Sequence, residues 1–247
     1  MNKPEPVLSE IPPVAAGRWR VRVLPQDHPD VGRALGLRAR LYRGGHDDRD
    51  EFDARARHLL VEEAATGRTA ACARLIAAQG ASITEGYTGR FYDLSPLARP
   101  GRLALELGRV AVDPEARDPD LWRLMLAALA RLARDEGVRL FFGCASFPGT
   151  DLQAHAPALA RLRGAVAPMA WRPGRIAPEA IPLPDGPPGP PAALPPVLRS
   201  WLGLGARVSD HAVLDRDLGT IHVFTGLPVA AIPAARRRLL LGIAGAA

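Results

Sequence analysis

The sequence is poor in cysteine and in long apolar runs, and each shortage excludes a class of protein. Two cysteines, Cys72 and Cys144, cannot build a disulfide framework in a chain of 247 residues, which favours reduced thiols. No stretch approaches the ~18 apolar residues that a membrane-spanning helix needs. Residues 1–17 also lack the apolar core of a signal peptide. We therefore expect a cytoplasmic protein.

Lysine is scarce as well, because arginine takes most of the basic positions. The net charge of +6 suits an acidic partner such as nucleic acid, an anionic membrane face or an acidic carrier protein. However, the arginines are spread over the whole chain, and neither a zinc-ligand spacing nor an aromatic ribonucleoprotein motif accompanies them. We expect no nucleic-acid partner, although a basic binding module stays an alternative that a salt-sensitive gel shift would reveal.

The chain length allows one large domain or two small ones. Residues 182–196 hold eight prolines in fifteen positions, a density that excludes a helix or a central strand. Because only about 50 residues follow, we predict a single α/β domain over residues 18–235, with a proline-rich excursion at 182–196. Residues 1–17 are expected to be a disordered tail and residues 236–247 a basic and apolar tail, with Arg236–Arg238 able to touch a membrane surface.

Alternation and helical periodicity predict strands and helices in mixed order. The predicted elements are a strand at 18–24, a helix capped by Asp27 and ending at Gly44-Gly45, a hairpin around Thr66-Gly67, a loop at 80–100, a strand at 103–112, a helix capped by Asp118 from Pro119 to Gly137, a strand at 138–146, a helix at 151–164, and a short helix with one or two strands after 196.

The stretch FFGCASFPGTD, residues 141–151, is a buried strand that loses its side-chain bulk from Gly143 to Ser146. Such a strand either lines a narrow cleft or packs beneath a helix. With the preceding strand LELGRVAV it resembles the N-acetyltransferase (GNAT) superfamily, in which two parallel strands splay apart and the pantetheine arm of the acyl donor lies in the gap. The resemblance implies a GNAT-like α/β fold, a central mixed sheet with splayed strands flanked by helices. It also implies an acyl cleft lined by Val110, Gly143, Cys144, Ala145 and Phe147.

Acetyl-coenzyme A users of that superfamily hold the pyrophosphate on a glycine-rich loop that opens a helix. The matching stretch here, DPEARDPDLW, has no glycine. We therefore expect no bound cofactor and an acyl donor carried on the phosphopantetheine of acyl carrier protein. The acidic surface of such a partner suits four arginines on or near this helix, which are otherwise a solvated face: Arg117, Arg123, Arg131 and Arg134.

Polar residues also resemble those of acyl-homoserine-lactone synthases: Arg38 with Tyr42, Asp50 with Asp53, Arg74, and Glu106 with Arg109. The expected tryptophan is missing, and RGGHDDR stands in its place. A closer resemblance, over roughly residues 20–235, is to the ornithine N-acyltransferases of bacterial ornithine-lipid synthesis. It rests on LRARLY, DEFD, HLLVEE, ELGRVAV, FFGCASFPGTD and the late segment LPPVLRSWLGLGARVSDHAVLDRDLGTIHVF.

That family joins a 3-hydroxyacyl chain from acyl carrier protein to the α-amine of L-ornithine, which gives lyso-ornithine lipid. The resemblance implies the same activity here, with peripheral binding to the inner leaflet of the cytoplasmic membrane. Three alternatives stay open: another acceptor such as glutamine or glycine, an acyl-homoserine-lactone-type signal, and a scaffold without activity.

The chemistry assigns roles to these residues. Glu106 is the expected general base for the attacking amine, and its alternative, an ion pair with Arg109, would need a β-bulge. Backbone N–H groups around Gly108–Val110 are expected to stabilise the oxyanion. Arg74 or Arg109 would bind the substrate carboxylate.

Asp50 or Asp53 would hold the δ-ammonium of ornithine, or else form a structural ion pair, and Arg38 belongs to the same substrate-binding set. Ser146 is expected to hydrogen-bond pantetheine or substrate. The histidine spacings match no metal motif, so we expect no metal. Asp210, His211 and Asp215 receive no role.

Overall fold

The computed structural model describes residues 8, 11–116, 118 and 120–245. The chain divides into two compact units, each made of segments far apart in the sequence. Unit 1 comprises Met1–Ala77, Leu105–Val138 and Ala234–Ala247, and unit 2 comprises Ala78–Ala104 and Arg139–Pro233. The proline-rich segment 182–196, for which the sequence predicted an excursion from a single domain, lies inside unit 2.

The sheet of unit 1 has the strand order β1 (Val14–Ala16), β2 (Trp19–Pro25), β3 (Arg57–Glu63), β4 (Thr69–Gln79) and β6 (Leu103–Val112). The first four strands pair antiparallel, with Val21 opposite Val61 and Leu59 opposite Ala73. The predicted hairpin and the predicted strand at 103–112 are confirmed. Residues 1–17 do not consist of a tail alone, because Val14 is buried and pairs with Val21 in the sheet.

Helix α1 (Val31–Tyr42) packs its apolar stripe, which includes Val31, Ala34 and Leu35, against Leu60 and Cys72 of the sheet. The prediction that Asp27 caps this helix is wrong, since the helix begins four residues later. Residues between β2 and α1 form turns, in which the N–H of His28 donates to the carbonyl of Pro25 at 3.1 Å. Asp30 occupies the cap position without a side-chain cap, because Arg22 binds its carboxylate at 2.6 Å.

Helix α2 (Asp120–Asp135) lies against β1, β2 and β3 and buries Leu121, Met125, Leu129 and Leu132, as its period predicted. The carboxylate of Asp118 accepts the N–H of Asp120 at 2.9 Å, so the predicted cap is present. The predicted first residue, Pro119, is outside the described residues.

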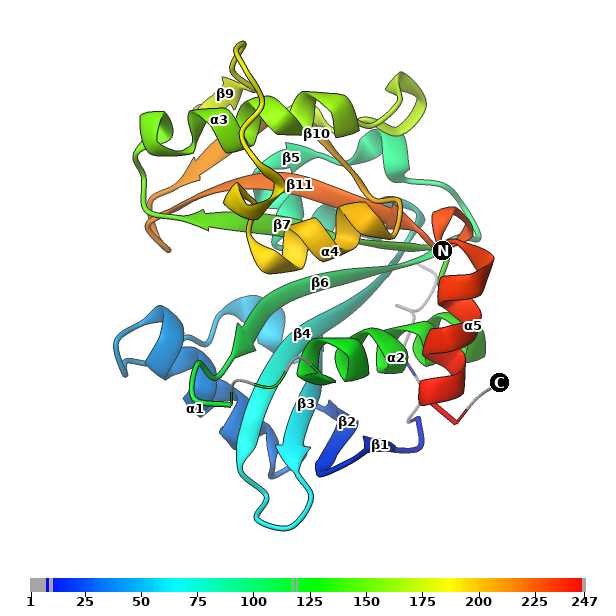
Figure 1. Ribbon diagram of the computed structural model, residues 1–247. Helices are drawn as coiled ribbons and strands as arrows, with labels where there is room; N and C mark the ends of the chain where they lie inside the picture. The colour runs from blue at the N-terminus through cyan, green and yellow to red at the C-terminus, as the bar shows by residue number, and fades with distance from the viewer. Residues whose placement is uncertain (1–7, 9–10, 117, 119, 246–247) are drawn as a thin grey trace. The chain divides into compact units, whose positions relative to one another are not determined.

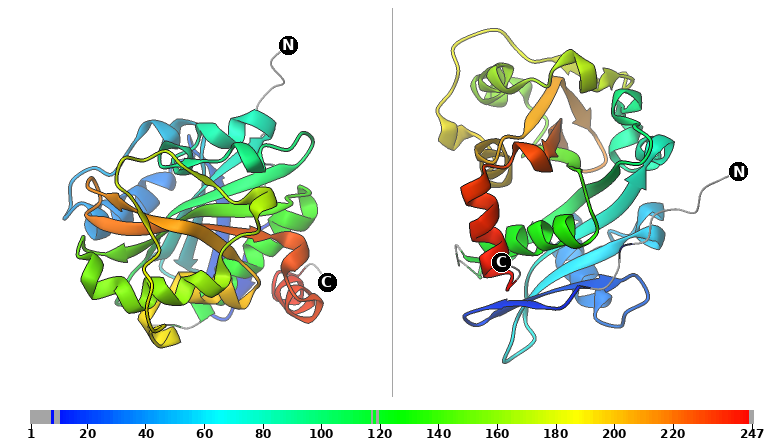
Figure 2. Two further views of the ribbon diagram at one scale, coloured as in Figure 1. Left: turned by 90° about the horizontal axis from the view of Figure 1, so that it is seen from above. Right: turned by 90° about the vertical axis from the view of Figure 1, so that its right-hand side faces the viewer.

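The C-terminal residues, predicted as a tail, form helix α5 (Ala234–Ile243), which runs beside α2 in Figures 1 and 2. Leu240 and Ala244 are four residues apart and make one buried stripe, which is the reason that this segment is ordered against α2. The guanidinium of Arg131 on α2 donates to the carbonyl of Ala244 at 3.2 Å and ties down the end of the helix.

The sheet of unit 2 is antiparallel, in the order β7 (Leu140–Pro148), β11 (Thr220–Pro228), β10 (Arg207–Asp215) and β9 (Ala180–Pro182). Helices α3 (Leu152–Leu162) and α4 (Pro196–Gly203) cover one face, where Leu159 and Leu198 pack against Val208 and Ala212 (Figure 1). Asp151 caps α3 through the N–H groups of Gln153 and Ala154.

Residues 80–100, predicted as a loop, cover the second face of this sheet. They form 3-10 turns and the short strand β5 (Tyr92–Asp93), which pairs with β8 (Gly174–Arg175). Tyr92, Leu94 and Leu97 pack there against Phe142 and Phe224. The loop is therefore a packed layer, which its aromatic residues make possible.

The small residues of β7 face large side chains of the neighbouring strand. Cys144 lies opposite Phe224 and Ser146 lies opposite His222, and the thiol of Cys144 also contacts the hydroxyl of Thr88 at 3.8 Å. Packing under residues 80–100 thus explains the small size of Cys144. The predicted cleft between β6 and β7 involves strands of different units and stays a prediction.

Alanine substitution at two glycines, one inside this packed layer and one on α1 as a control, tests the packing. A Cβ at Gly89 would overlap the backbone carbonyl of Thr84, whereas a Cβ at Gly36 on α1 meets nothing within 4 Å. We expect Gly89→Ala to lower the free energy of unfolding by more than about 2 kcal/mol. Gly36→Ala should raise it by about 0.5–1 kcal/mol, because alanine favours a helix. Urea unfolding of both variants measures this, and equal stabilities would contradict the packing described for residues 80–100.

Candidate active site

Unit 1 contains a buried cluster of three arginines and three aspartates, contributed by α1, β4, β6 and the segment between α1 and β3. Its members are Arg38, Asp48, Asp50, Asp53, Arg74 and Arg109. Five of the six were predicted as substrate-binding residues, and the structure brings all five together. We call this group the Arg–Asp cluster.

Arg38 lies at the centre of the Arg–Asp cluster, and its side chain is fully buried. Its Nη1 and Nη2 atoms donate to the two carboxylate oxygens of Asp53 at 2.7 and 3.0 Å, and its Nε donates to Asp48 at 2.8 Å. Burial by itself lowers the pKa of Arg38, but the hydrogen bonds and charges of Asp53 and Asp48 outweigh it and raise the pKa above the usual value. Arg38 is therefore a permanently charged structural centre.

Asp50 and Asp53 form a capping box at the 3-10 turn Glu51–Arg55 (η1), which is why the DEFD motif has this spacing. The carboxylate of Asp53 accepts the N–H of Asp50 at 3.0 Å, and the carboxylate of Asp50 accepts the N–H of Phe52 at 3.0 Å. The turn thus aims both carboxylates at the arginines of the cluster.

Arg74 and Arg109 complete the cluster from the sheet. Arg74 binds Asp50 and lies 3.5 Å from Asp53, while Arg109 donates to Asp48 at 3.1 Å and to Asp50 at 3.2 Å. Every carboxylate oxygen of the three aspartates therefore has a guanidinium partner, since Arg43 binds the remaining oxygen of Asp48 at 3.1 Å. The charges of Asp50 and Asp53 are therefore already compensated by guanidinium groups.

Asp48 is the member of the cluster that the sequence interpretation missed. Its side chain is completely buried, and it accepts from three arginines. In the sequence it is one of several acidic residues in HDDRDEFD, and neighbouring Asp47 is exposed. Because both residues are aspartates, the sequence gives no sign that Asp48 is buried in the cluster while Asp47 is exposed.

Strand β6 is irregular at Arg109, whose φ of 50° lies in the left-handed region. Such a conformation costs about 1–3 kcal/mol in a residue other than glycine, and here the ion pairs of Arg109 hold it. The hydroxyl of Tyr42, the last residue of α1, donates to the carbonyl of the following residue, Val110. The irregularity lies three residues beyond Glu106, which is buried.

The arginines predicted to bind a carrier protein differ in exposure. Arg123 and Arg134 reach the surface, where they pair with Asp120 and Asp135. Arg131 is mostly buried and is engaged by Asp135 and the carbonyl of Ala244. Arg117 lies outside the described residues.

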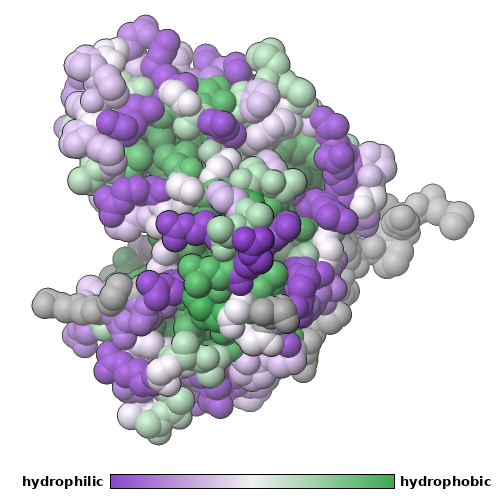
Figure 3. Space-filling model, turned by 45° about the vertical axis from the view of Figure 1, so that its right-hand side comes forward, coloured by the Kyte–Doolittle hydropathy of each residue, from purple (hydrophilic) through white to green (hydrophobic). Residues whose placement is uncertain are grey.

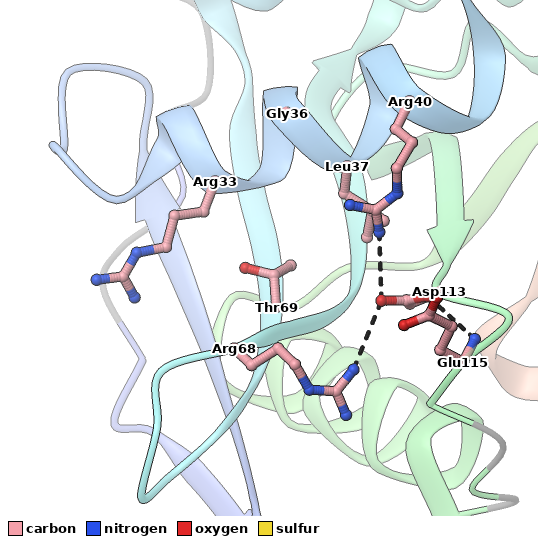
Figure 4. A pocket seen from close by; sticks show the side chains of 8 residues that line it. All are labelled: Arg33, Gly36, Leu37, Arg40, Arg68, Thr69, Asp113 and Glu115. Atoms are coloured by element: carbon pink, nitrogen blue, oxygen red, sulfur yellow. Dashed lines mark hydrogen bonds and ion pairs between the residues drawn. The ribbon is translucent and has the colours of Figure 1, made fainter. Parts of the chain in front are cut away.

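A pocket of about 530 Å³ lies in unit 1 between α1, the start of β4 and the end of β6 (Figure 4). Arg40 and Arg68 converge in it on Asp113, at 3.2 and 3.5 Å. Arg33, also on its wall, binds Glu62 at 3.2 Å. Each of these cations has a carboxylate partner, but the lining keeps one excess positive charge, because its three arginines face two carboxylates, Asp113 and Glu115.

No group of three or more histidine, cysteine, aspartate or glutamate side chains in the described part of the chain is arranged to hold a metal ion.

The comparisons with known proteins identify both the fold and relatives. Residues 36–127 match the family model described as acetyltransferase (GNAT) domain. The L-ornithine N(alpha)-acyltransferase of Rhizobium meliloti (strain 1021) is 33% identical over an alignment 247 residues long. The alignment covers 91% of this chain and 78% of that protein. The enzyme of the same name from Rhodobacter capsulatus is 33% identical over 196 residues, covering 72% and 74%.

A solved structure agrees with the fold. The loading GNATL domain of CurA from Lyngbya majuscula has a TM-score of 0.51 and 13% identity, covering 87% of this chain and 99% of that domain. The GNAT fold predicted from the sequence is confirmed.

Asp53 supports a stability prediction. Burial by itself raises the pKa of Asp53, but the hydrogen bond and charge of Arg38 outweigh burial. The net effect lowers the pKa of Asp53 from 3.8 to about 2. Because the pKa is lower in the folded protein, the stabilisation is complete above about pH 4 and is lost as the pH falls toward about 2. Asp53→Asn should lower the free energy of unfolding at pH 7 by about 3–5 kcal/mol, since it removes a carboxylate from buried Arg38.

The matched control is exposed Asp47→Asn, which should change stability by less than about 0.5 kcal/mol. Guanidinium unfolding from pH 7 to pH 2.5 measures both variants. The difference between wild type and Asp53→Asn should shrink below pH 4, and a constant difference would refute the assignment.

Proposed function

The chain belongs to the family of L-ornithine N(alpha)-acyltransferases, and we propose that it transfers a 3-hydroxyacyl chain from acyl carrier protein to the α-amine of L-ornithine, giving lyso-ornithine lipid. The observation that carries this proposal is the similarity to enzymes of that name over nine-tenths of the chain. The protein is an acyltransferase with a GNAT fold.

Glu106 is the proposed general base. The α-amine of an amino acid is mostly protonated at neutral pH, so it must lose a proton before it can attack the thioester carbon. A carboxylate removes that proton directly or through a water molecule. The burial of Glu106 within β6, three residues before the irregularity at Arg109, supports this role because a catalytic carboxylate acts best away from bulk water.

The same irregularity supports the proposed oxyanion site. A residue with positive φ interrupts the regular ladder of a strand and turns backbone groups away from it. The N–H groups around Gly108–Val110 are proposed to donate to the oxyanion of the tetrahedral intermediate. Collapse of that intermediate expels the pantetheine thiolate, and the new amide bond stays on ornithine.

Arg109 is the proposed partner of the substrate α-carboxylate, in preference to Arg74. Both guanidinium groups belong to the Arg–Asp cluster, but Arg109 lies on the same strand as Glu106 and next to the proposed oxyanion donors. A carboxylate bound there would bring the adjacent α-amine near the base. Planar guanidinium donors suit this recognition.

Acyl carrier protein is proposed as the donor because the segment after β6 lacks the glycines that hold a pyrophosphate. Exposed Arg123 and Arg134 on α2 support an acidic protein partner. Because surface ion pairs are weak, the aspartates beside these arginines leave them able to exchange partners.

Helix α5 is the proposed contact with an anionic membrane surface. Arg236, Arg237 and Arg238 are exposed, followed by exposed Leu239, and the helix has no acidic residue in its first turn. Figure 3, which brings the side bearing α5 forward, shows hydrophobic groups beside strongly hydrophilic ones on this face. The product has a fatty chain and partitions to membranes. No helix among the described residues is long and apolar enough to cross one.

The activity is tested with purified protein, 3-hydroxyacyl carrier protein and a pool of the common amino acids. Mass spectrometry of the organic phase should show 3-hydroxyacyl-ornithine. Glu106→Gln should reduce its rate by about 10²–10⁴-fold, because the variant lacks the base. Glu115→Gln, an exposed change after the same strand, is the control and should keep the wild-type rate.

The outcomes separate the parts of the proposal. A product on another amino acid would replace ornithine as the acceptor and keep the chemistry. Product formation from the coenzyme A thioester alone would replace the donor. Undiminished activity of Glu106→Gln would refute the base.

Membrane binding is tested by co-sedimentation with phosphatidylcholine vesicles that contain or lack phosphatidylglycerol. The triple variant Arg236→Gln, Arg237→Gln, Arg238→Gln should bind the anionic vesicles on the order of a hundredfold more weakly, at about 1 kcal/mol for each arginine. Arg123→Gln on α2 is the control. Equal binding of wild type and triple variant would exclude α5 as the contact.

A further inference from the structure

Helix α1 ends on a tyrosine whose hydroxyl reaches β6, the strand that carries the proposed base. Tyr42 is the last residue of α1, and its hydroxyl donates to the backbone carbonyl of Val110 at 2.5 Å. Its ring packs against the apolar group that joins α1 to the sheet, which includes Leu60, Cys72 and Ala111. The hydroxyl thus ties the end of a helix to the backbone of a strand 68 residues further along the chain.

The carbonyl that Tyr42 holds belongs to the peptide group between Val110 and Ala111. This peptide group is trans, so its carbonyl and its N–H point in opposite directions. On the far side, Ala111 makes a backbone hydrogen bond to the sulfur of Cys72 on β4, whose thiol donates to the carbonyl of Ala34 at 3.6 Å. Hydrogen bonds at both ends therefore fix the plane of this peptide group.

The backbone on the other side of Val110 is anchored as well. Arg109 has a φ of 50°, and its guanidinium donates to Asp48 at 3.1 Å and to Asp50 at 3.2 Å. The peptide group between Arg109 and Val110 thus lies between two anchored points. Its N–H, that of Val110, is one of the proposed oxyanion donors. The direction of that N–H depends on both anchors, because turning a peptide group changes the dihedral angles on either side of it.

The hydroxyl of Tyr42 is a permanent donor in this arrangement. Burial raises the pKa of Tyr42 above its ordinary value. The charges of Cys72 and Asp48 act in the same direction, while that of Arg109 opposes them. The hydroxyl therefore keeps its proton at neutral pH, and a carbonyl oxygen can only accept it as a hydrogen bond.

An anchored donor is what the proposed chemistry requires. Donors that are in place before the oxyanion forms need no reorganisation at the moment of reaction. The conformation of Arg109 is strained, and such strain persists only where the surrounding structure holds it. Loss of the Tyr42 hydroxyl would release one of the two anchors, and the N–H of Val110 would turn as the backbone relaxes.

We infer that Tyr42 is a positioning residue for acyl transfer, because its hydroxyl holds the carbonyl of Val110 and thereby fixes the direction of the N–H of Val110. This inference rests on the proposed function and narrows its oxyanion site, from the N–H groups around Gly108–Val110 to that of Val110. Tyr42 acts through the backbone and exchanges no proton with the substrate.

Tyr42→Phe tests this role, since it removes the hydroxyl and keeps the ring and the charge. The kcat for acylation of ornithine should fall about ten- to a hundredfold, part of the roughly 10²–10³-fold that complete loss of an oxyanion donor costs. The KM for ornithine and for the acyl donor should stay within about twofold, because the interaction acts in the transition state. The pH dependence of kcat should keep its shape, because Tyr42 transfers no proton.

Tyr87→Phe is the matched control. It removes a hydroxyl hydrogen bond of the same length, 2.5 Å, to the carboxylate of Asp215 in unit 2. Because that acceptor is charged, urea unfolding should show at least as large a loss of stability as in Tyr42→Phe, and yet kcat should stay at the wild-type value. An unchanged kcat in Tyr42→Phe, an equal fall of kcat in both variants, or an altered pH dependence would overturn the positioning role.

Backbone NMR measures the geometry without catalysis. In Tyr42→Phe the ¹³C resonance of the Val110 carbonyl should move, and amide hydrogen exchange at Ala111 should become about tenfold faster, as expected for the loss of one hydrogen bond. Tyr87→Phe should change neither. A wild-type protein that acylates no amino acid would refute the proposed function, whereas an active wild type with unchanged Val110 and Ala111 signals in Tyr42→Phe would refute this inference alone.

Discussion

Unit 1 depends on a requirement for electrical neutrality around the guanidinium of Arg38, which is fully buried. An isolated buried charge costs several kcal/mol, so carboxylates must reach it from elsewhere in the chain. The segment after α1 therefore turns back into the core and presents Asp48 and Asp53. These aspartates and Asp50 in turn hold Arg74 and Arg109, which fixes the strained backbone of Arg109 in β6. One charge thus organises a helix, a turn and two strands.

The same requirement marks Asp50 and Asp53 as structural carboxylates. They stand in a motif that suggests substrate binding, yet each of their oxygens has a guanidinium partner. Asp215 in unit 2 is buried as well, but within the described residues its hydrogen bonds come from neutral donors, the hydroxyl of Tyr87 and two backbone N–H groups. Cations thus stabilise the buried carboxylates of one unit, whereas hydrogen bonds alone stabilise Asp215 in the other.

Much of the fold could be predicted because its determinants are local. The strand at 103–112 and the hairpin at Thr66-Gly67 follow from alternation and turn residues. The first residue of α1 could not be predicted in this way, because Arg22 on β2 binds the carboxylate of Asp30 and no side chain caps the helix. The resemblance to known families identified five of the six members of the Arg–Asp cluster. It could not predict which arginine pairs with which aspartate, because that depends on the tertiary structure. Asp215 and His222 meet only through the register of β10 and β11, which no spacing in the sequence encodes.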